Sequence, residues 1–228
     1  MASVGGDKIA FVFDVATGKT VKNFSGHNAR INSVSFNDDD SVLVTGSYDG
    51  TVRFWDMKQS KNRCLDVVKS FKDSVSHVIV SRHHIYASSI DGYIRHIDLR
   101  AGEVTADYVG EAIVSMDLTA DKKSLIIGTL DSKIRLWSIG MGEELNEYSG
   151  HANKSYVIKS KLSKDNSFFV TGSEDGKCFF YQFLDSDPCH KINAHADVVS
   201  CVDINRKNGA LLTASHDKTI KLWTPEQN

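Results

Sequence analysis

Short runs of apolar residues alternate with brief polar turns along the whole chain. Runs such as 52–55 and 134–137 are rich in branched and aromatic side chains, which favour extended strands. Similar runs precede them at 41–44 and 124–127, and an aspartate followed by glycine, serine or lysine between two such runs is typical of a tight hairpin turn. Because helical periodicity is sustained nowhere, the pattern predicts an all-β protein.

One short phrase recurs through the chain: a small or hydroxyl residue, any residue, and then aspartate. The aspartates of this phrase are Asp7, Asp49, Asp91, Asp131, Asp175 and Asp217. They are separated by 42, 42, 40, 44 and 42 positions. The residues six positions further on are Phe13, Trp55, Ile97, Trp137, Tyr181 and Trp223. So regular a period predicts an array of equal structural units.

Each period holds four candidate strands, which for the unit after His27 are predicted at 31–36, 42–46, 51–56 and 64–71. A ring of four-stranded blades buries faces that no single blade covers, so the period predicts a β-propeller. A β-sandwich is the alternative, but sandwiches do not repeat a four-stranded unit at constant length. We predict a single propeller domain over 1–228, with units at about 1–25 (partial), 26–72, 73–110, 111–149, 150–194 and 195–228 (partial).

The predicted strands add up to 22, with three in each of the two terminal units. Seven blades need about 28 strands, and six need about 24. We therefore expect a seven-bladed parent that lacks its N-terminal blade and a half, which would leave an open arc with exposed apolar faces and strand edges. A six-bladed ring that is short of two strands is the alternative.

Three of the units carry a histidine that precedes the turn aspartate by 22 or 24 residues and a threonine four residues before that aspartate. With the later aromatic residue, these side chains resemble the structural tetrad of the WD40-repeat family, and the resemblance covers all 228 residues. It implies three hydrogen-bonded networks, which consist of His27, Thr45, Asp49 and Trp55; of His151, Thr171, Asp175 and Tyr181; and of His195, Thr213, Asp217 and Trp223.

A hydroxyl, an imidazole and a carboxylate in one network also make up a catalytic triad. Repetition decides against that interpretation, because an enzyme needs one such site whereas each blade needs its own paired polar groups. We therefore expect no enzymatic activity and no catalytic residue. The two middle units lack the histidine and have Ala87 and Ile127 in place of the threonine, so we expect them to depend on apolar packing. Arg53, Arg95 and Arg135 recur four residues after their aspartates and are interpreted as solvated blade edges, with a basic stripe for RNA as the alternative.

Some stretches are more specific than the general repeat. Residues 142–151, 95–102, 107–110 and 173–177 look like the mitogen-activated protein kinase organizer family of WD repeat scaffolds. Members of that family gather components of a kinase cascade and also occur with splicing complexes. The resemblance implies a seven-bladed parent and residence in the cytoplasm, and also in the nucleus.

Composition narrows the choice of partner. The net charge of -2 provides no basic field, so we expect neither direct nucleic-acid binding nor a membrane surface. The four cysteines lack metal-ligand spacing, and adjacent His83 and His84 point to opposite faces of a strand, so no metal is expected. No glycine-rich phosphate loop opens a helix, and we expect no cofactor and no small-molecule substrate.

The function that follows is a non-enzymatic scaffold for protein partners, such as kinases of a MAP kinase cascade. The alternative is a structural subunit of an RNA-processing, spliceosomal assembly with splicing factors as partners. In the family the turn that carries each aspartate opens on one face of the ring, so the residue before it is expected to point at solvent. The candidate partner-binding residues are Arg30, Tyr48, Ile90 and Leu130.

Overall fold

Antiparallel hairpins account for the whole fold, as the alternation of apolar and polar residues predicts. The computed structural model describes residues 1–59, 63–205 and 207–224. Within them all regular structure is β-strand, and no helix is long and apolar enough to cross a membrane. The strands form six antiparallel sheets, and the sheets belong to two units, Met1–Ala112 and Ile113–Asn228.

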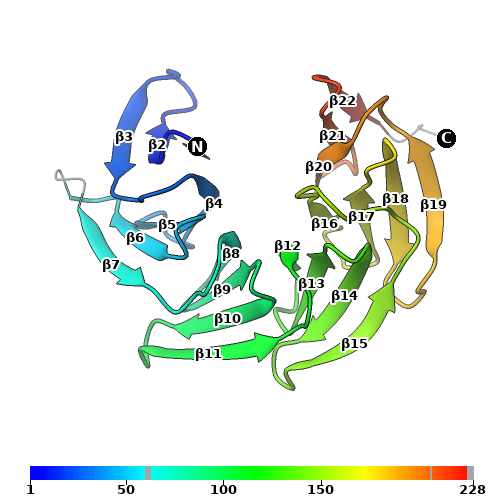
Figure 1. The fold of residues 1–228 in the computed structure, drawn as a ribbon. Helices are drawn as coiled ribbons and strands as arrows, with labels where there is room; N and C mark the ends of the chain where they lie inside the picture. The colour runs from blue at the N-terminus through cyan, green and yellow to red at the C-terminus, as the bar shows by residue number, and fades with distance from the viewer. Residues whose placement is uncertain (60–62, 206, 225–228) are drawn as a thin grey trace. The chain divides into compact units, whose positions relative to one another are not determined.

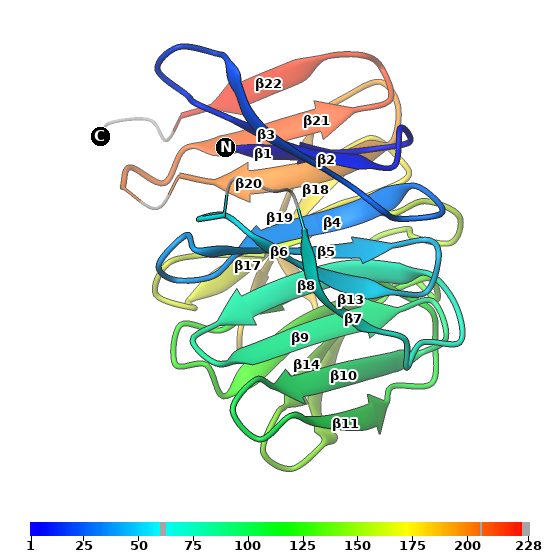
Figure 2. The ribbon, with the colours of Figure 1, turned by 90° about the vertical axis from the view of Figure 1, so that its left-hand side faces the viewer.

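The first unit holds three sheets (Figure 1). The N-terminal sheet consists of β1 (Ala2–Val4), β2 (Ile9–Phe13) and β3 (Thr20–Ser25). The second sheet consists of β4 (Ile31–Phe36), β5 (Val42–Ser47), β6 (Val52–Asp56) and β7 (Cys64–Val68). The third consists of β8 (Val75–Ser81), β9 (His84–Ser89), β10 (Tyr93–Asp98) and β11 (Glu103–Tyr108), which lie side by side in Figure 2.

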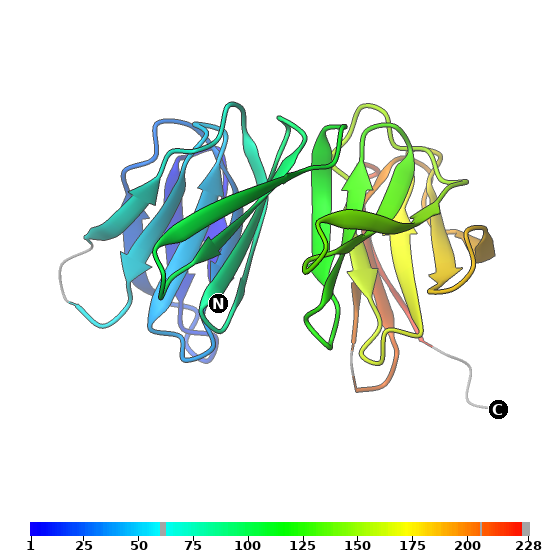
Figure 3. The ribbon, with the colours of Figure 1, turned by 90° about the horizontal axis from the view of Figure 1, so that it is seen from below.

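The second unit also holds three sheets (Figure 3, green to red). The first of them consists of β12 (Ile113–Leu118), β13 (Ser124–Thr129), β14 (Lys133–Ser138) and β15 (Glu143–Tyr148). The next consists of β16 (Ser160–Leu162), β17 (Phe168–Gly172), β18 (Lys177–Gln182) and β19 (Pro188–Asn193). The C-terminal sheet consists of β20 (Val199–Ile204), β21 (Leu211–Ser215) and β22 (Ile220–Trp223).

The all-β prediction is confirmed, and the strands of the second sheet begin and end within a few residues of their predicted bounds. The seven-bladed parent and the single-domain organisation stay predictions. Residues 60–62 of the predicted unit 26–72, and residues 206 and 225–228 of the predicted unit 195–228, lie outside the described residues.

The hairpin turn that follows the second strand of each repeat has the same backbone conformation throughout. The residue directly after the turn aspartate has a positive φ in all six repeats, namely Lys8, Gly50, Gly92, Ser132, Gly176 and Lys218. Three of these residues are glycine, which adopts this conformation without the steric cost of a Cβ. The turn geometry is therefore a property of the repeat, and each aspartate lies at an equivalent point.

Sheets within a unit pack face to face through alternate residues of their strands. In the first unit Val44, Val52 and Phe54 of the second sheet are buried in one cluster with Val78 and Ile97 of the third. In the second unit, Ile126, Ile134 and Leu136 are buried in a cluster with Phe169 and Tyr181 of the following sheet. The core is thus a series of layers between sheets, each of which covers a face that its neighbour leaves apolar.

Two glycines allow this close approach. A Cβ at Gly172 would lie 2.0 Å from the carbonyl oxygen of Val199 in the next sheet, and one at Gly46 would lie 2.6 Å from a Val75 methyl group. Backbone cannot yield in the way that a side-chain end can, so Gly172 meets the more rigid obstacle.

We predict that Gly172→Ala lowers the free energy of unfolding of the second unit by about 3 kcal/mol, because overpacking forces the two sheets apart. Thermal melts followed by near-ultraviolet circular dichroism measure the loss. Gly140→Ala is the matched control, since a Cβ there meets nothing within 4 Å. Equal melting temperatures for the two variants would contradict the close packing at Gly172.

Candidate functional site

A chain of four hydrogen-bonded side chains crosses the second sheet from its turn to its interior. The Nδ1 of His27 lies 2.9 Å from Oδ2 of Asp49, and its Nε2 lies 2.8 Å from Oγ1 of Thr45. The indole N–H of Trp55 donates to the same threonine oxygen over 2.9 Å. The structure therefore brings together all four residues that the sequence assigned to this network.

The direction of each hydrogen bond follows from the ionised carboxylate, which can only accept. Nδ1 of His27 therefore carries the imidazole proton and donates it to Asp49. Nε2 of the neutral ring is then an acceptor, so the Thr45 hydroxyl donates to it and accepts the indole N–H of Trp55. The carboxylate at the end of the chain also accepts the Asn28 backbone N–H and the Thr51 hydroxyl.

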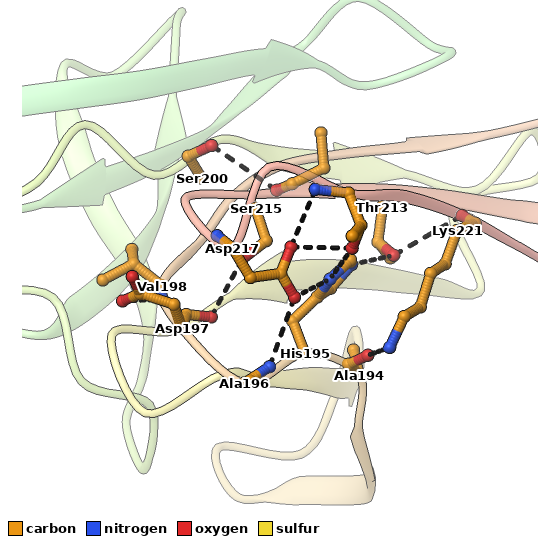
Figure 4. A network of polar contacts seen from close by, with 12 residues as sticks. Ala194, His195, Ala196, Asp197, Val198, Ser200, Thr213, Ser215, Asp217 and Lys221 are labelled. Atoms are coloured by element: carbon orange, nitrogen blue, oxygen red, sulfur yellow. Dashed lines mark hydrogen bonds and ion pairs between the residues drawn. The ribbon is translucent and has the colours of Figure 1, made fainter.

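The C-terminal sheet repeats this arrangement, as Figure 4 shows around His195. His195 Nδ1 lies 2.8 Å from Asp217 Oδ2, and Nε2 lies 2.8 Å from Thr213 Oγ1. Trp223 donates its indole N–H to Thr213 over 3.0 Å. Two sheets in different units thus hold the turn to the strands by the same four residue types.

The network sets the charge state of its members. Burial alone would raise the pKa of Asp49, but hydrogen bonds from Thr51, Asn28 and His27 lower it to about 2. Burial lowers the pKa of His27 despite the neighbouring carboxylate. A neutral imidazole and an ionised aspartate therefore coexist near neutral pH.

The third predicted network does not form. His151 Nδ1 contacts only the Tyr181 hydroxyl, at 3.3 Å, and its Nε2 is buried without a hydrogen-bond partner. Thr171 instead accepts from Ser160, and Asp175 is exposed and pairs with Lys177 at 2.6 Å.

Two features of the sequence explain this departure. His151 precedes its turn aspartate by 24 residues, whereas the spacing is 22 in the other two networks. Tyr181 also replaces the indole, and its hydroxyl donates to the carbonyl oxygen of Ser149 over 2.9 Å instead of to the threonine. The prediction that His151, Thr171, Asp175 and Tyr181 form one network was therefore wrong.

The two middle sheets pair their turn aspartates with arginine. Arg95 holds Asp91 through two nitrogens at 3.1 and 2.8 Å, and both side chains are 6% exposed. In the next sheet Arg135 lies 2.5 Å from Asp131 and also pairs with Glu144. Neither arginine is a solvated blade edge, and neither sheet depends on apolar packing alone, so both expectations were wrong. A guanidinium on the adjacent strand takes the place of the missing histidine and threonine.

The predicted partner-binding residues differ in exposure. Tyr48 is 57% exposed, and the Arg30 guanidinium lies over its ring at 5.3 Å from the centroid. Ile90 and Leu130 are only partly exposed, so each offers a partner less accessible surface than Tyr48 does, and their role in binding stays a prediction. Ile90 follows the same rule as Tyr48, because each donates its backbone N–H to the loop before the first strand of its sheet. Leu130 belongs to the second unit.

A further exposed aromatic residue was not predicted. Tyr156 lies in the loop before β16, is 41% exposed, and makes a T-shaped contact with the His216 ring, with 5.0 Å between the ring centroids. Glu174, the residue before Asp175, accepts the backbone N–H groups of three successive residues, which are Lys154, Ser155 and Tyr156. The sequence gives no signal for this contact, because no repeat pattern relates the loop around Tyr156 to the carboxylate of Glu174.

The described residues hold no group of three or more histidine, cysteine, aspartate or glutamate side chains arranged for a metal ion. The arrangement around Tyr48 is a rigid, exposed turn, which is suited to contact with another macromolecule. The tetrad side chains beneath it hold the turn in place.

A comparison with protein families identifies the repeated unit of this chain. The family model described as "WD domain, G-beta repeat" matches residues 18–56, 142–182 and 186–224, which together make up just over half of the chain. Each matched segment contains one of the three histidines, whereas the sheets with Arg95 and Arg135 paired to aspartate fall largely outside the matches.

Several curated proteins are similar over much of the chain. The WD repeat domain-containing protein 83 homolog of Dictyostelium discoideum is 29% identical, over 95% of this chain and 76% of that protein. WD repeat domain-containing protein 83 of Rattus norvegicus is 38% identical, over 68% of this chain and 49% of that protein. The WD repeat-containing protein WDS homolog of Arabidopsis thaliana is 26% identical, over 99% of this chain and 44% of that protein. The matches thus span about half of the rat and Arabidopsis relatives and three quarters of the Dictyostelium one.

We predict that Asp91→Ala lowers the free energy of unfolding of the first unit by about 3 kcal/mol, because it leaves a buried guanidinium unpaired. The double variant Asp91→Ala with Arg95→Met should recover most of that loss, since no buried charge remains. Chemical denaturation of the wild type and the two variants measures both changes. A double variant less stable than the single one would contradict the pairing.

Burial lowers the pKa of His151 to about 4, against 6.5 in the unfolded chain. Between these values the unfolded chain binds a proton that the folded one does not, so stability falls as the pH drops from about 6.5 to about 4. We predict a loss of roughly 3 kcal/mol over this window from this residue. Denaturation at several pH values measures it, with His151→Phe as a non-titrating comparison. Parallel pH profiles for the two proteins would contradict the prediction.

Proposed function

This chain belongs to the WD-domain, G-beta repeat family, and we propose that it is a non-enzymatic scaffold that presents its turn faces to protein partners. The single observation that carries the proposal is the exposed Arg30 and Tyr48 pair, named here the Tyr48 patch. The finer proposal is that these partners are kinases of a MAP kinase cascade, which the protein gathers in the cytoplasm and also in the nucleus.

The buried tetrads support a structural role for their hydroxyls. Thr45 and Thr213 are fully buried, and each hydroxyl already accepts an indole N–H and lies against an imidazole nitrogen. A nucleophile must reach its substrate, and these two oxygens belong to side chains that are fully buried. Their chemistry supports the proposal that the networks hold the fold together.

The Tyr48 patch has the physical character of a binding anchor. The Tyr48 N–H donates to the Arg30 carbonyl oxygen over 3.0 Å, and the Ser47 hydroxyl donates to the same oxygen over 2.8 Å. The next residue is Asp49, whose carboxylate is hydrogen-bonded to the buried imidazole of His27. A partner that binds here finds an aromatic ring whose backbone is already ordered, so little conformational entropy is lost.

The choice of kinases rests on the resemblance of residues 95–102, 107–110, 142–151 and 173–177 to the kinase organizer family. The kinase proposal concerns the partners of a whole protein, whereas this chain spans about half the length of several relatives that it matches. A pull-down from cell extract with mass spectrometry tests it. Enrichment of cascade kinases would support the finer proposal, and enrichment of splicing proteins would replace it with a role in an RNA-processing assembly.

We predict that Tyr48→Ser and Arg30→Ala each weaken partner capture about tenfold or more, because truncating a central aromatic or arginine removes a binding hot spot. Melting temperatures should stay within about 2 °C of the wild type, since both side chains lie on the surface. Calorimetry with a captured partner measures the affinity.

Val15→Ser is the matched control, because Val15 is an exposed apolar residue in the β2–β3 connection, outside the turn that carries an aspartate. Capture that is unchanged in Tyr48→Ser but lost in Val15→Ser would overturn the assignment of the binding face. Loss in both variants, with intact folding, would also count against the Tyr48 patch as the anchor.

A further inference from the structure

The outer strand of a sheet carries two side chains that face the next sheet of the same unit. One belongs to the residue that pairs with the position three after the turn aspartate, and the other to the residue that pairs with the position five after it. They lie two residues apart on one strand, so both point to the same face. These residues are Phe24 and Lys22 in the sheet β1–β3, Val68 and Asp66 in the sheet β4–β7, and Tyr148 and Asn146 in the sheet β12–β15.

The N-terminal sheet supplies a ring and a cation to the second sheet. Phe24 is fully buried, and its ring is stacked on Trp55 with 5.3 Å between the centroids. The Lys22 ammonium lies 6.0 Å from the centroid of the Phe24 ring. It donates to the carbonyl oxygen of Gln59 over 2.5 Å and lies 3.5 Å from that of Asp56. An aromatic group therefore fills the space between these two sheets, and a donor beside it binds the backbone of the second.

The sheet β12–β15 supplies the same two functions through one residue. Tyr148 is fully buried, and its ring lies 4.8 Å from that of Phe169 in the sheet β16–β19. Its hydroxyl donates to the carbonyl oxygen of Phe183 over 2.8 Å. Asn146 adds a hydrogen bond from the Ser186 hydroxyl over 3.1 Å. A ring and a donor thus fill the equivalent space in the second unit.

The sheet β4–β7 supplies neither a ring nor a donor to the third sheet. Val68 stands where Phe24 and Tyr148 stand, and Asp66 carries a carboxylate, which can only accept. An open groove of about 320 Å³ lies here between the two sheets. We call it the β7–β11 groove.

The lining of the β7–β11 groove is apolar and acidic. Leu65, Leu99 and Val104 line it and are 48%, 48% and 43% exposed. Asp66 and Asp98 line it too, and no cationic side chain is among its described lining residues. The Asp66 carboxylate accepts the Val67 N–H over 2.7 Å and forms no ion pair with a described residue. Single exposed apolar residues are common, but three around one hollow beside a carboxylate are typical of a binding site.

We propose that the β7–β11 groove binds a segment of another protein that presents an aromatic ring two residues from a lysine or arginine. The ring occupies the space beside Val68, as Phe24 and Tyr148 do elsewhere, and the cation pairs with Asp66. Two carboxylates and no cation disfavour an acidic segment, because like charges repel across an interface. None of the lining residues belongs to the Tyr48 patch, so this is a second binding surface, beyond the one that the proposed function uses.

Nuclear magnetic resonance of backbone amides tests the proposal on the 228-residue chain. The probe is the tripeptide Lys-Asn-Phe, acetylated and amidated at its ends, which copies residues 22–24. It should shift the amides of residues 65–68 and 99–104 with a dissociation constant of roughly a few millimolar, as expected of so small a ligand. Glu-Asn-Phe lacks the cation and Lys-Asn-Ala lacks the ring, so each should bind about tenfold more weakly or less.

Two variants of the chain separate the ring from the cation. Val68→Phe fills the β7–β11 groove from within, so it should abolish binding of Lys-Asn-Phe and raise the melting temperature by about 3 °C. Asp66→Asn should weaken binding about tenfold and leave the melting temperature within about 1 °C, because the side chain is exposed. Asp185→Asn is the matched control, since Asp185 is an exposed carboxylate in the β18–β19 connection, and it should bind like the wild type.

Several results would overturn the proposal. Absence of shifts at residues 65–68 and 99–104 shows that the groove does not take this ligand. Equal binding of Glu-Asn-Phe and Lys-Asn-Phe shows that no carboxylate selects a cation there. Binding that survives in folded Val68→Phe shows that the ring lies elsewhere. Where Val68→Phe does not fold, Asp66→Asn decides, and unchanged binding in that variant contradicts the pairing with Asp66.

Discussion

A carboxylate in the turn after the second strand of each repeat is the constraint on which the structure depends. The turn needs an aspartate because its oxygens accept the backbone N–H two residues later, as Asp49 does from Thr51 and Asp217 from Thr219. In the complete sheets of the first unit these carboxylates are also largely removed from water. A buried charge must be paired, so a sheet whose turn aspartate is buried has to supply a partner.

The chain meets this requirement in two chemical ways. The second and C-terminal sheets place a neutral histidine between the carboxylate and a buried threonine, and an indole completes the chain of donors. The two middle sheets place an arginine four residues after the aspartate, which binds it directly. Both arrangements tie the turn to the strands below it. The turn that carries Tyr48 is rigid for this reason, and a rigid exposed aromatic residue can bind a partner at a small entropic cost.

The same repetition governs how the sheets cover one another. Each sheet has two apolar faces, and such a face is buried when another sheet of the same kind packs against it. Gly46 and Gly172 allow the backbones to approach closely enough for that packing. Stability within each unit therefore depends on one kind of interface, which is repeated between neighbouring sheets.

The sequence by itself determined the features that depend on local periodicity. Alternating apolar residues and the regular spacing of Asp7 to Asp217 predicted the strands, their hairpins and four-stranded units, because side-chain alternation and turn conformation are short-range properties. The histidine networks of Asp49 and Asp217 were also predictable, since their members keep the same spacing in both units.

Only the tertiary structure decided the features that depend on how side chains reach across strands. The sequence predicted that Arg95 and Arg135 lie at the surface, whereas in the structure each forms an ion pair with the turn aspartate of its own sheet. His151 kept its place in the repeat yet lost Thr171 and Asp175, because two extra residues and a phenol in place of an indole changed what its ring nitrogens meet. Glu174 was joined to the loop around Tyr156 in the same way. Spacing along the chain sets which residues lie near each other, but the hydrogen-bond partner of each polar atom depends on side-chain length and direction in three dimensions.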